Sequence, residues 1–134
     1  LHDALPISAH GMVHWNELNT RDVAKAKAFY AETFGWTYND MPIEGGTYVL
    51  IMVGEQLVGG MFDITAPEFD GMPAHWFTYF ACDDIDAVVG KVAGAGGMVI
   101  RPPWDMPTVG RIAIVKDSSG AVSGWMMPEQ PPAA

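Results

Sequence analysis

The chain has little of what marks several large classes of protein. Its 134 residues include one cysteine, Cys82, so no disulfide can form within the chain, and a reducing cytoplasm is the expected location. Only seven Lys and Arg residues stand against sixteen Asp and Glu, and the net charge of −9 disfavours a phosphate backbone as a partner. The longest apolar run, residues 48–53, is far shorter than the roughly 20 residues that span a bilayer. We therefore expect no nucleic-acid or membrane partner.

The length and the apolar fraction of 49% suit a single domain with a sizeable core. Residues 1–10 join no periodic pattern and lack the cationic start and long apolar run of a secretory signal, so we expect an assembly scar or a loose tail there. Residues 129–134 are rich in proline and are expected to form a second tail. The predicted domain covers residues 11–128.

One pattern occurs twice in this domain. The segment HWNELNTRD, which begins at His14, is matched by HWFTYFACD, which begins at His75, at an offset of 61 residues. Each copy alternates apolar and polar residues with a period of two, which is typical of a strand. In the first copy, Trp15 and Glu17 are expected on one face of the strand and His14 on the other.

Each predicted strand runs into a predicted helix, because apolar residues next recur at helical spacing. The candidate N-caps are Thr20 or Asp22 for the first helix and Asp83 or Asp84 for the second, and the candidate stops are Gly35 and Gly96. Three short β-rich stretches follow each helix. The sequence therefore predicts two βαβββ modules, residues 11–63 and 74–128, joined by an exposed linker over residues 64–73.

The duplication and the segments FYAETFGW and GRIAIVKDSSGA together resemble the vicinal oxygen chelate superfamily, which includes glyoxalase I, bleomycin-resistance proteins and extradiol dioxygenases. The similarity covers about residues 11–128. The resemblance implies an α+β fold in which two βαβββ modules form curved, barrel-like mixed sheets around a cavity. It also implies a homodimer, which would cover open sheet edges. Because one fold supports many chemistries, the function has to be argued from the site.

Metal-using members of this superfamily bind the ion in that cavity through the first and last strands of each module. The four positions that the resemblance assigns to ligands are occupied by Trp15, Gly60, Trp76 and Gly124. Neither an indole nor a glycine offers a lone pair to a divalent cation, so we expect no metal cofactor. A one-residue shift of the strands is the alternative, because it would gather His14, His75 and Glu17 into a site for Zn, Fe, Ni or Mn.

Three residues are candidates for chemistry without a metal. Glu17 is expected to face the cavity among apolar side chains, where desolvation would raise its pKa and suit it to acid-base catalysis. It could instead accept a structural hydrogen bond from Tyr79, Arg111 or a backbone amide. Arg111 could pair with Glu17, hold a ligand carboxylate, or form a salt bridge within its own module. Tyr79 adds a phenol where module one, at offset 61, has Leu18.

Five Trp and nine Met are many for this length and suit an adaptable apolar pocket. The candidate ligand-binding residues are Trp15, Asn19, Met61, Trp76, Thr78, Trp104 and Trp125. The leading hypothesis is a metal-independent protein that sequesters or isomerises a small apolar or aromatic molecule. The alternative is a metal-dependent lyase, isomerase or dioxygenase, and a third possibility is an interaction protein whose own aromatic residues fill the cavity.

Overall fold

The structure is a computed structural model that describes residues 8–129. Most of the two predicted tails, residues 1–7 and 130–134, lies outside the described residues. Residues 8–10 are within them, and His10 accepts a hydrogen bond through Nδ1 from the backbone N–H of Asp83 at 3.0 Å. None of the helices in the described part of the chain is long and apolar enough to cross a membrane.

The chain divides into two compact units. One unit runs from Trp15 to Phe77, and the other joins the chain from Thr78 onward to the residues up to His14. The first unit holds nearly all of module one and the second nearly all of module two, since each boundary falls inside the opening strand of a module. The order of elements is βαβββ in both modules, so the predicted duplicated α+β fold is confirmed.

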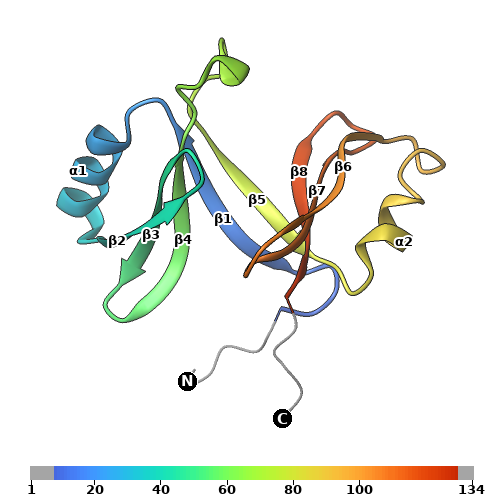
Figure 1. Ribbon diagram of the computed structural model, residues 1–134, viewed down its shortest axis with the longest axis horizontal. Coiled ribbons are helices and arrows are strands. Elements are labelled where there is room, and N and C mark those ends of the chain that lie inside the picture. Colours follow the sequence, from blue (N-terminus) through green and yellow to red (C-terminus); the bar gives the residue numbers. More distant parts are fainter. Residues whose placement is uncertain (1–7, 130–134) are drawn as a thin grey trace. The chain divides into compact units, whose positions relative to one another are not determined.

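Module one is a mixed four-stranded sheet with a helix against it (Figure 1). Its elements are β1 (Val13–Thr20), α1 (Val23–Phe34), β2 (Thr37–Ile43), β3 (Gly46–Val53) and β4 (Gln56–Asp63). The strands lie in the order β2-β3-β4-β1, with β1 parallel to β4 and the other pairs antiparallel. The sheet is open rather than closed into a barrel, because β2 has a neighbour on one side only.

The helix of module one begins and ends where the sequence predicts. The Asp22 carboxylate accepts a hydrogen bond from the backbone N–H of Lys25 at 2.9 Å, and Gly35 ends the helix at a φ of 74°. The core between α1 and the sheet contains four buried residues, Leu18, Val49, Ile51 and Met61. They lie on one face of the sheet because Leu18 pairs with Met61 and side chains alternate along each strand.

The linker between the modules is held to module one by the Arg21 guanidinium and by a backbone hydrogen bond from the Ile64 N–H to the Thr20 carbonyl. It contains a short 3₁₀ helix, Pro67–Phe69. The Arg21 guanidinium donates through Nη1 to the carbonyl oxygens of Ile64 at 3.1 Å, Phe69 at 3.1 Å and Met72 at 3.3 Å. These three backbone carbonyls of the linker thus share one donor group on Arg21, which precedes the N-cap residue of α1.

Module two repeats this arrangement. Its elements are β5 (His75–Ala81), α2 (Ile85–Val89), β6 (Met98–Met106), β7 (Gly110–Lys116) and β8 (Val122–Pro128). The strands lie in the order β5-β8-β7-β6, with β5 parallel to β8 and the other pairs antiparallel. This sheet is also open, because β6 has one neighbour.

The second helix is much shorter than the sequence predicts. It stops at Val89, and the chain continues in turns to Gly96. Gly90 and Gly94 interrupt the predicted helical stretch, and glycine disfavours the interior of a helix. The apolar stripe keeps its role, since Ile85 and Val92 are buried in module two. The prediction that these two residues are buried is therefore confirmed, although the helix ends before it reaches Val92.

The true offset between the opening strands is 62 residues, not the 61 that the repeated His-Trp pair indicates. Asp84, not Asp83, caps α2, as Asp22 caps α1. In the parallel pairs, Glu17 lies opposite Gly60 and Tyr79 lies opposite Gly124. Tyr79 is therefore the counterpart of Glu17 rather than of Leu18.

This shift separates the two matched tryptophans. The counterpart of Trp15 in module two is Phe77, and the counterpart of Trp76 in module one is His14. The repeated dipeptide is thus out of register by one residue between the modules. The position seven residues before the capping Asp84, where the resemblance assigns a metal ligand, holds Phe77, which has no coordinating atom.

Candidate functional site

Three side chains of module one form a hydrogen-bonded row on the face of β1 that points away from the Leu18 core. The Trp15 indole donates through Nε1 to the Tyr48 hydroxyl at 3.0 Å, and the Tyr48 hydroxyl donates to Glu17 Oε1 at 2.8 Å. Glu17 is only 8% exposed. A buried carboxylate needs such donors, because desolvation makes an unpartnered charge costly. The row brings Trp15 and Glu17 together as their shared strand face predicts.

Tyr48 reaches this position because Gly60 has no side chain. A Cβ at Gly60 would overlap the ring and hydroxyl of Tyr48. Gly60 also lies directly opposite Glu17 in the β1–β4 pair. The resemblance assigns a last-strand metal ligand to Gly60, and the phenol of Tyr48 occupies the space that a side chain there would need.

Asn19 and His75 are joined on the same strand face. Pro73 offers only its carbonyl oxygen, 2.8 Å from His75 Nδ1, so Nδ1 carries the proton and donates. His75 Nε2 must then accept from the Asn19 amide nitrogen at 3.2 Å. Both ring nitrogens of His75 are thereby engaged. The buried Asn19 Oδ1 has no hydrogen-bond partner in the described part of the chain.

The alternative metal site is not assembled in this structure. Among residues 8–129, no group of three or more His, Cys, Asp or Glu side chains is arranged to hold an ion, so His14, His75 and Glu17 do not form the ligand set considered from the sequence. His14 Nδ1 is buried without a hydrogen-bond partner among the described residues. Desolvation lowers the pKa of His14 below its ordinary value of 6.5.

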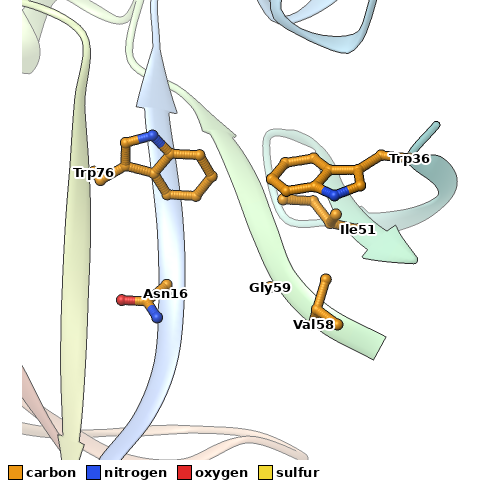
Figure 2. Close-up of a pocket in the computed structure, with 6 residues that line it drawn as sticks. All are labelled: Asn16, Trp36, Ile51, Val58, Gly59 and Trp76. Carbon is orange, nitrogen blue, oxygen red and sulfur yellow. The ribbon is translucent and has the colours of Figure 1, made fainter. Parts of the chain in front are cut away.

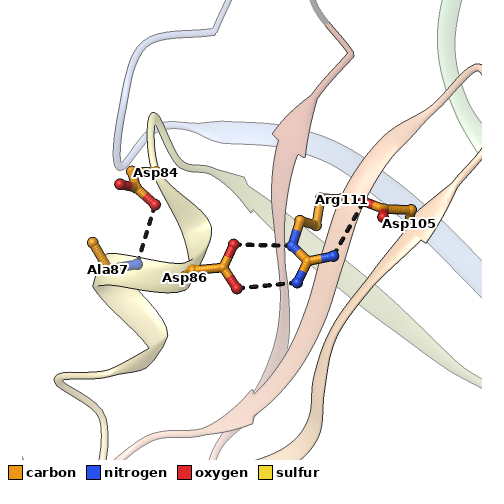
Figure 3. A network of polar contacts seen from close by, with 5 residues as sticks. All are labelled: Asp84, Asp86, Ala87, Asp105 and Arg111. Carbon is orange, nitrogen blue, oxygen red and sulfur yellow. Dashed lines mark hydrogen bonds and ion pairs between the residues drawn. The ribbon is translucent and has the colours of Figure 1, made fainter.

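Arg111 forms a salt bridge within module two (Figure 3). Its guanidinium binds the Asp86 carboxylate through Nε at 2.9 Å and Nη2 at 3.1 Å, and its Nη1 binds Asp105 at 3.2 Å. These bonds hold the pKa of Asp86 below its usual range and that of Arg111 above it. Asp84 caps the adjacent helix in the same view through the backbone N–H of Ala87 at 3.2 Å. Of the roles considered for Arg111, the intramodule salt bridge is the one that the structure contains.

The other candidate residues of module two lie in different environments. Trp104 on β6 is covered by the Arg101 guanidinium, 3.6 Å from its ring centroid. Trp125 packs against the module-two core and donates through Nε1 to Ser123 Oγ at 3.2 Å. Thr78 and Tyr79 are half-buried on β5.

Two further candidates, Met61 of β4 and Trp76 of β5, lie on the side of β1 that carries α1. Met61 is completely buried in the core there. Trp76 is 45% exposed and contacts Trp36, with ring centroids 6.1 Å apart. Trp76 therefore does not share the strand face of Trp15 and Glu17. It lines a pocket of about 340 Å³ together with Asn16, Trp36, Ile51, Val58 and Gly59 (Figure 2).

Comparison with known proteins agrees with this architecture. Residues 11–122 match the Glyoxalase/Bleomycin resistance protein/Dioxygenase superfamily. The chain belongs to this superfamily. Among solved structures, methylmalonyl-CoA epimerase from Mycobacterium tuberculosis superimposes with a TM-score of 0.64 at 15% identity, over 96% of this chain and 95% of that one. At that identity the likeness shows the fold alone.

Two curated relatives are closer in sequence. A Mycobacterium tuberculosis protein named "Putative glyoxylase CFP32" is 41% identical over 123 residues, which are 91% of this chain and 46% of that protein. The "Anthracycline biosynthesis protein DnrV" of Streptomyces peucetius is 37% identical over 125 residues, covering 84% of this chain and 46% of that protein. The chain thus spans about half the length of these relatives.

Sequence reasoning missed Tyr48 and Trp36. Tyr48 alternates with the buried Val49 and belongs to β3, so its strand face was readable, but its contact with Glu17 depends on pairing between strands distant in sequence. Trp36 follows the helix stop at Gly35, and its approach to Trp76 joins residues 40 positions apart. The glycine at position 60 was the available signal, because a missing side chain next to a buried carboxylate makes room for a neighbour.

Proposed function

We propose that this superfamily member binds a small, largely apolar organic molecule against the face of module one that carries Trp15, Tyr48 and Glu17. In this proposal Glu17, held by Tyr48, supplies the polar contact or the acid-base chemistry that a metal supplies in other members. The observation that carries the proposal is the Tyr48 hydroxyl donating to Glu17 at 2.8 Å in the space above Gly60.

The chemistry of the three side chains supports this reading. A phenol that donates to a carboxylate stabilises its charged form, and the indole that donates to the phenol keeps the hydroxyl proton directed at Glu17. An indole beside them offers a flat apolar surface to a ligand ring. One relative is named for anthracycline biosynthesis, a chemistry of fused aromatic rings, which agrees with an aromatic ligand.

Binding at this face is tested by replacing the five tryptophans with 5-fluorotryptophan and recording one fluorine NMR signal for each indole. A panel of hydroxylated aromatic compounds should include members that shift the Trp15 signal in a saturable way. Tyr48→Phe should weaken that binding by on the order of tenfold, because a buried hydrogen bond is worth about 1 kcal/mol or more. Tyr38→Phe is the matched control, since its hydroxyl bonds the Lys27 carbonyl instead.

Glu17→Gln separates sequestration from catalysis. If Glu17 acts in acid-base chemistry, turnover of a bound compound should collapse while its affinity changes little. Metal analysis of the purified protein completes the test. Stoichiometric bound metal that is lost in His14→Ala or His75→Ala would overturn the proposal in favour of the metal-dependent enzyme.

A further inference from the structure

The pocket between Trp36 and Trp76 lies on the opposite side of β1 from Glu17. It opens beside Asn16, which alternates with Trp15 and Glu17 along the strand. Its volume of about 340 Å³ falls within the range of small-molecule sites, which begins near 300 Å³. The proposal for the Glu17 face does not use this space.

The indoles of Trp36 and Trp76 both border the pocket (Figure 2). Their planes meet at 90°, with centroids 6.1 Å apart. Tyr30 of α1 stabilises both: it stacks on Trp36 at 4.7 Å with planes 21° apart, and meets Trp76 edge-on at 5.9 Å. Trp76 nevertheless remains 45% exposed, so the aromatic cluster supports the pocket without filling it.

The floor of the pocket is a strand that lacks a side chain at the critical point. A Cβ on Gly59 would lie 2.6 Å from the backbone oxygen of Asn16, which cannot move without disrupting β1. Only glycine therefore fits, and the hollow above it follows from the strand pairing. Val58 and Ile51 complete an apolar surface.

We propose that this pocket binds a flat, uncharged aromatic molecule of one or two fused rings. A planar guest in the corner can stack on one indole while its edge meets the face of the other, and both geometries are favourable for aromatic pairs. None of the six lining residues is charged. An anionic ligand would therefore lose hydration without gaining a partner.

Asn16 gives the pocket its one polar side chain. A carboxamide has two N–H donors and an oxygen acceptor, so it can bond a ring hydroxyl or ring nitrogen in addition to other contacts. Because the rest of the lining is largely apolar, a hydrogen bond to Asn16 would orient a ligand more than it would add to its affinity. The preferred guest thus carries a single polar substituent on an otherwise apolar ring system.

The test uses the fluorotryptophan-labelled chain with 2-naphthol as the probe. Saturable shifts are expected at the Trp36 and Trp76 signals, with Trp104 and Trp125 unmoved. Val58→Phe, which fills the pocket from its 40% exposed side chain, should weaken binding by about tenfold or more. Val53→Phe adds the same bulk at a 48% exposed valine of β3 outside the pocket lining and should leave the affinity unchanged.

Several outcomes would overturn this inference. They are an absence of saturable shifts at Trp36 and Trp76, equal affinity in Val58→Phe and the unaltered chain, or tighter binding of choline than of 2-naphthol at the same two signals. The last result would identify the two indoles as a cation cage instead. Because Tyr48→Phe acts on the other side of the sheet, it should not change the Trp36 and Trp76 response. The two ligand proposals can therefore fail separately.

Discussion

The two modules share a backbone plan but differ in the side chains at equivalent positions. The row Trp15, Tyr48 and Glu17 in module one corresponds to Phe77, Ile112 and Tyr79 in module two. Both modules keep a glycine in the last strand: Gly60 lies opposite Glu17, and Gly124 lies opposite Tyr79. Duplication has therefore preserved the pairing of the strands, while the buried carboxylate with its phenol donor belongs to module one alone. The fold is a property of both halves, and the candidate chemistry is a property of one.

The largest effect should come from closing the space that distinguishes module one. Gly60→Ala places a methyl group against the Tyr48 ring and should lower the free energy of unfolding by about 2 kcal/mol, the typical cost of overpacking. Urea denaturation measures this change. Gly46→Ala is the control, because a Cβ there meets nothing within 4 Å.

A double mutant identifies the cause of that loss. If the Tyr48 ring is the obstacle, Gly60→Ala should cost much less in a Tyr48→Ala background, since contacting residues are energetically coupled. Equal costs in both backgrounds would mean that the backbone at position 60, rather than the Tyr48 ring, requires glycine. The Tyr48 contact would then not explain the difference between the modules.

A smaller effect should come from His14, the counterpart of the exposed Trp76. Burial lowers the His14 pKa below 6.5, so folding favours the neutral ring. Stability from this residue is complete above pH 6.5 and falls as the pH drops through that value toward the lower folded-state pKa. Between about pH 7 and pH 5, the melting temperature of the His14→Gln variant should therefore fall less than that of the unaltered chain.

The smallest effect should come from the exposed ion pairs, where the modules differ in geometry. Arg111 binds Asp86 through two contacts, whereas Lys27 binds Asp40 through one at 3.0 Å. The pKa of Asp86 is depressed, so its contribution is present above the ordinary value of 3.8 and is lost as the pH falls through the lower folded-state pKa. Asp86→Asn should flatten the acid side of the stability profile below about pH 4 in thermal unfolding.

The fold could be predicted from the sequence because its signals are local. Alternation in β1, the cap at Asp22 and the stop at Gly35 each depend on residues within a few positions of one another. The register between the modules could not be predicted in the same way. The His-Trp pair is repeated identically in the sequence. Module two, however, has one more residue between this pair and its N-cap Asp84, so Trp76 lies on the other face of the strand.

The site was predictable only in part. The shared strand face of Trp15 and Glu17 follows from a period of two, whereas the Tyr48 bridge between them requires the pairing of β1, β4 and β3. Arg111 could not be placed from sequence, because its partner Asp86 was one of many acidic residues in reach. The small-molecule partner, the homodimer and the cytoplasmic location stay predictions.

The adjacent glycines of β4 have a structural consequence. Gly59 leaves a hollow on the α1 side of the sheet, and Gly60 admits a phenol on the other side. At these two positions the surface of the sheet is formed by the backbone of β4 alone. A Cβ at Gly59 would meet the backbone of β1 and a Cβ at Gly60 would meet the Tyr48 ring, so two neighbouring positions of one strand are restricted to glycine by obstacles on opposite faces.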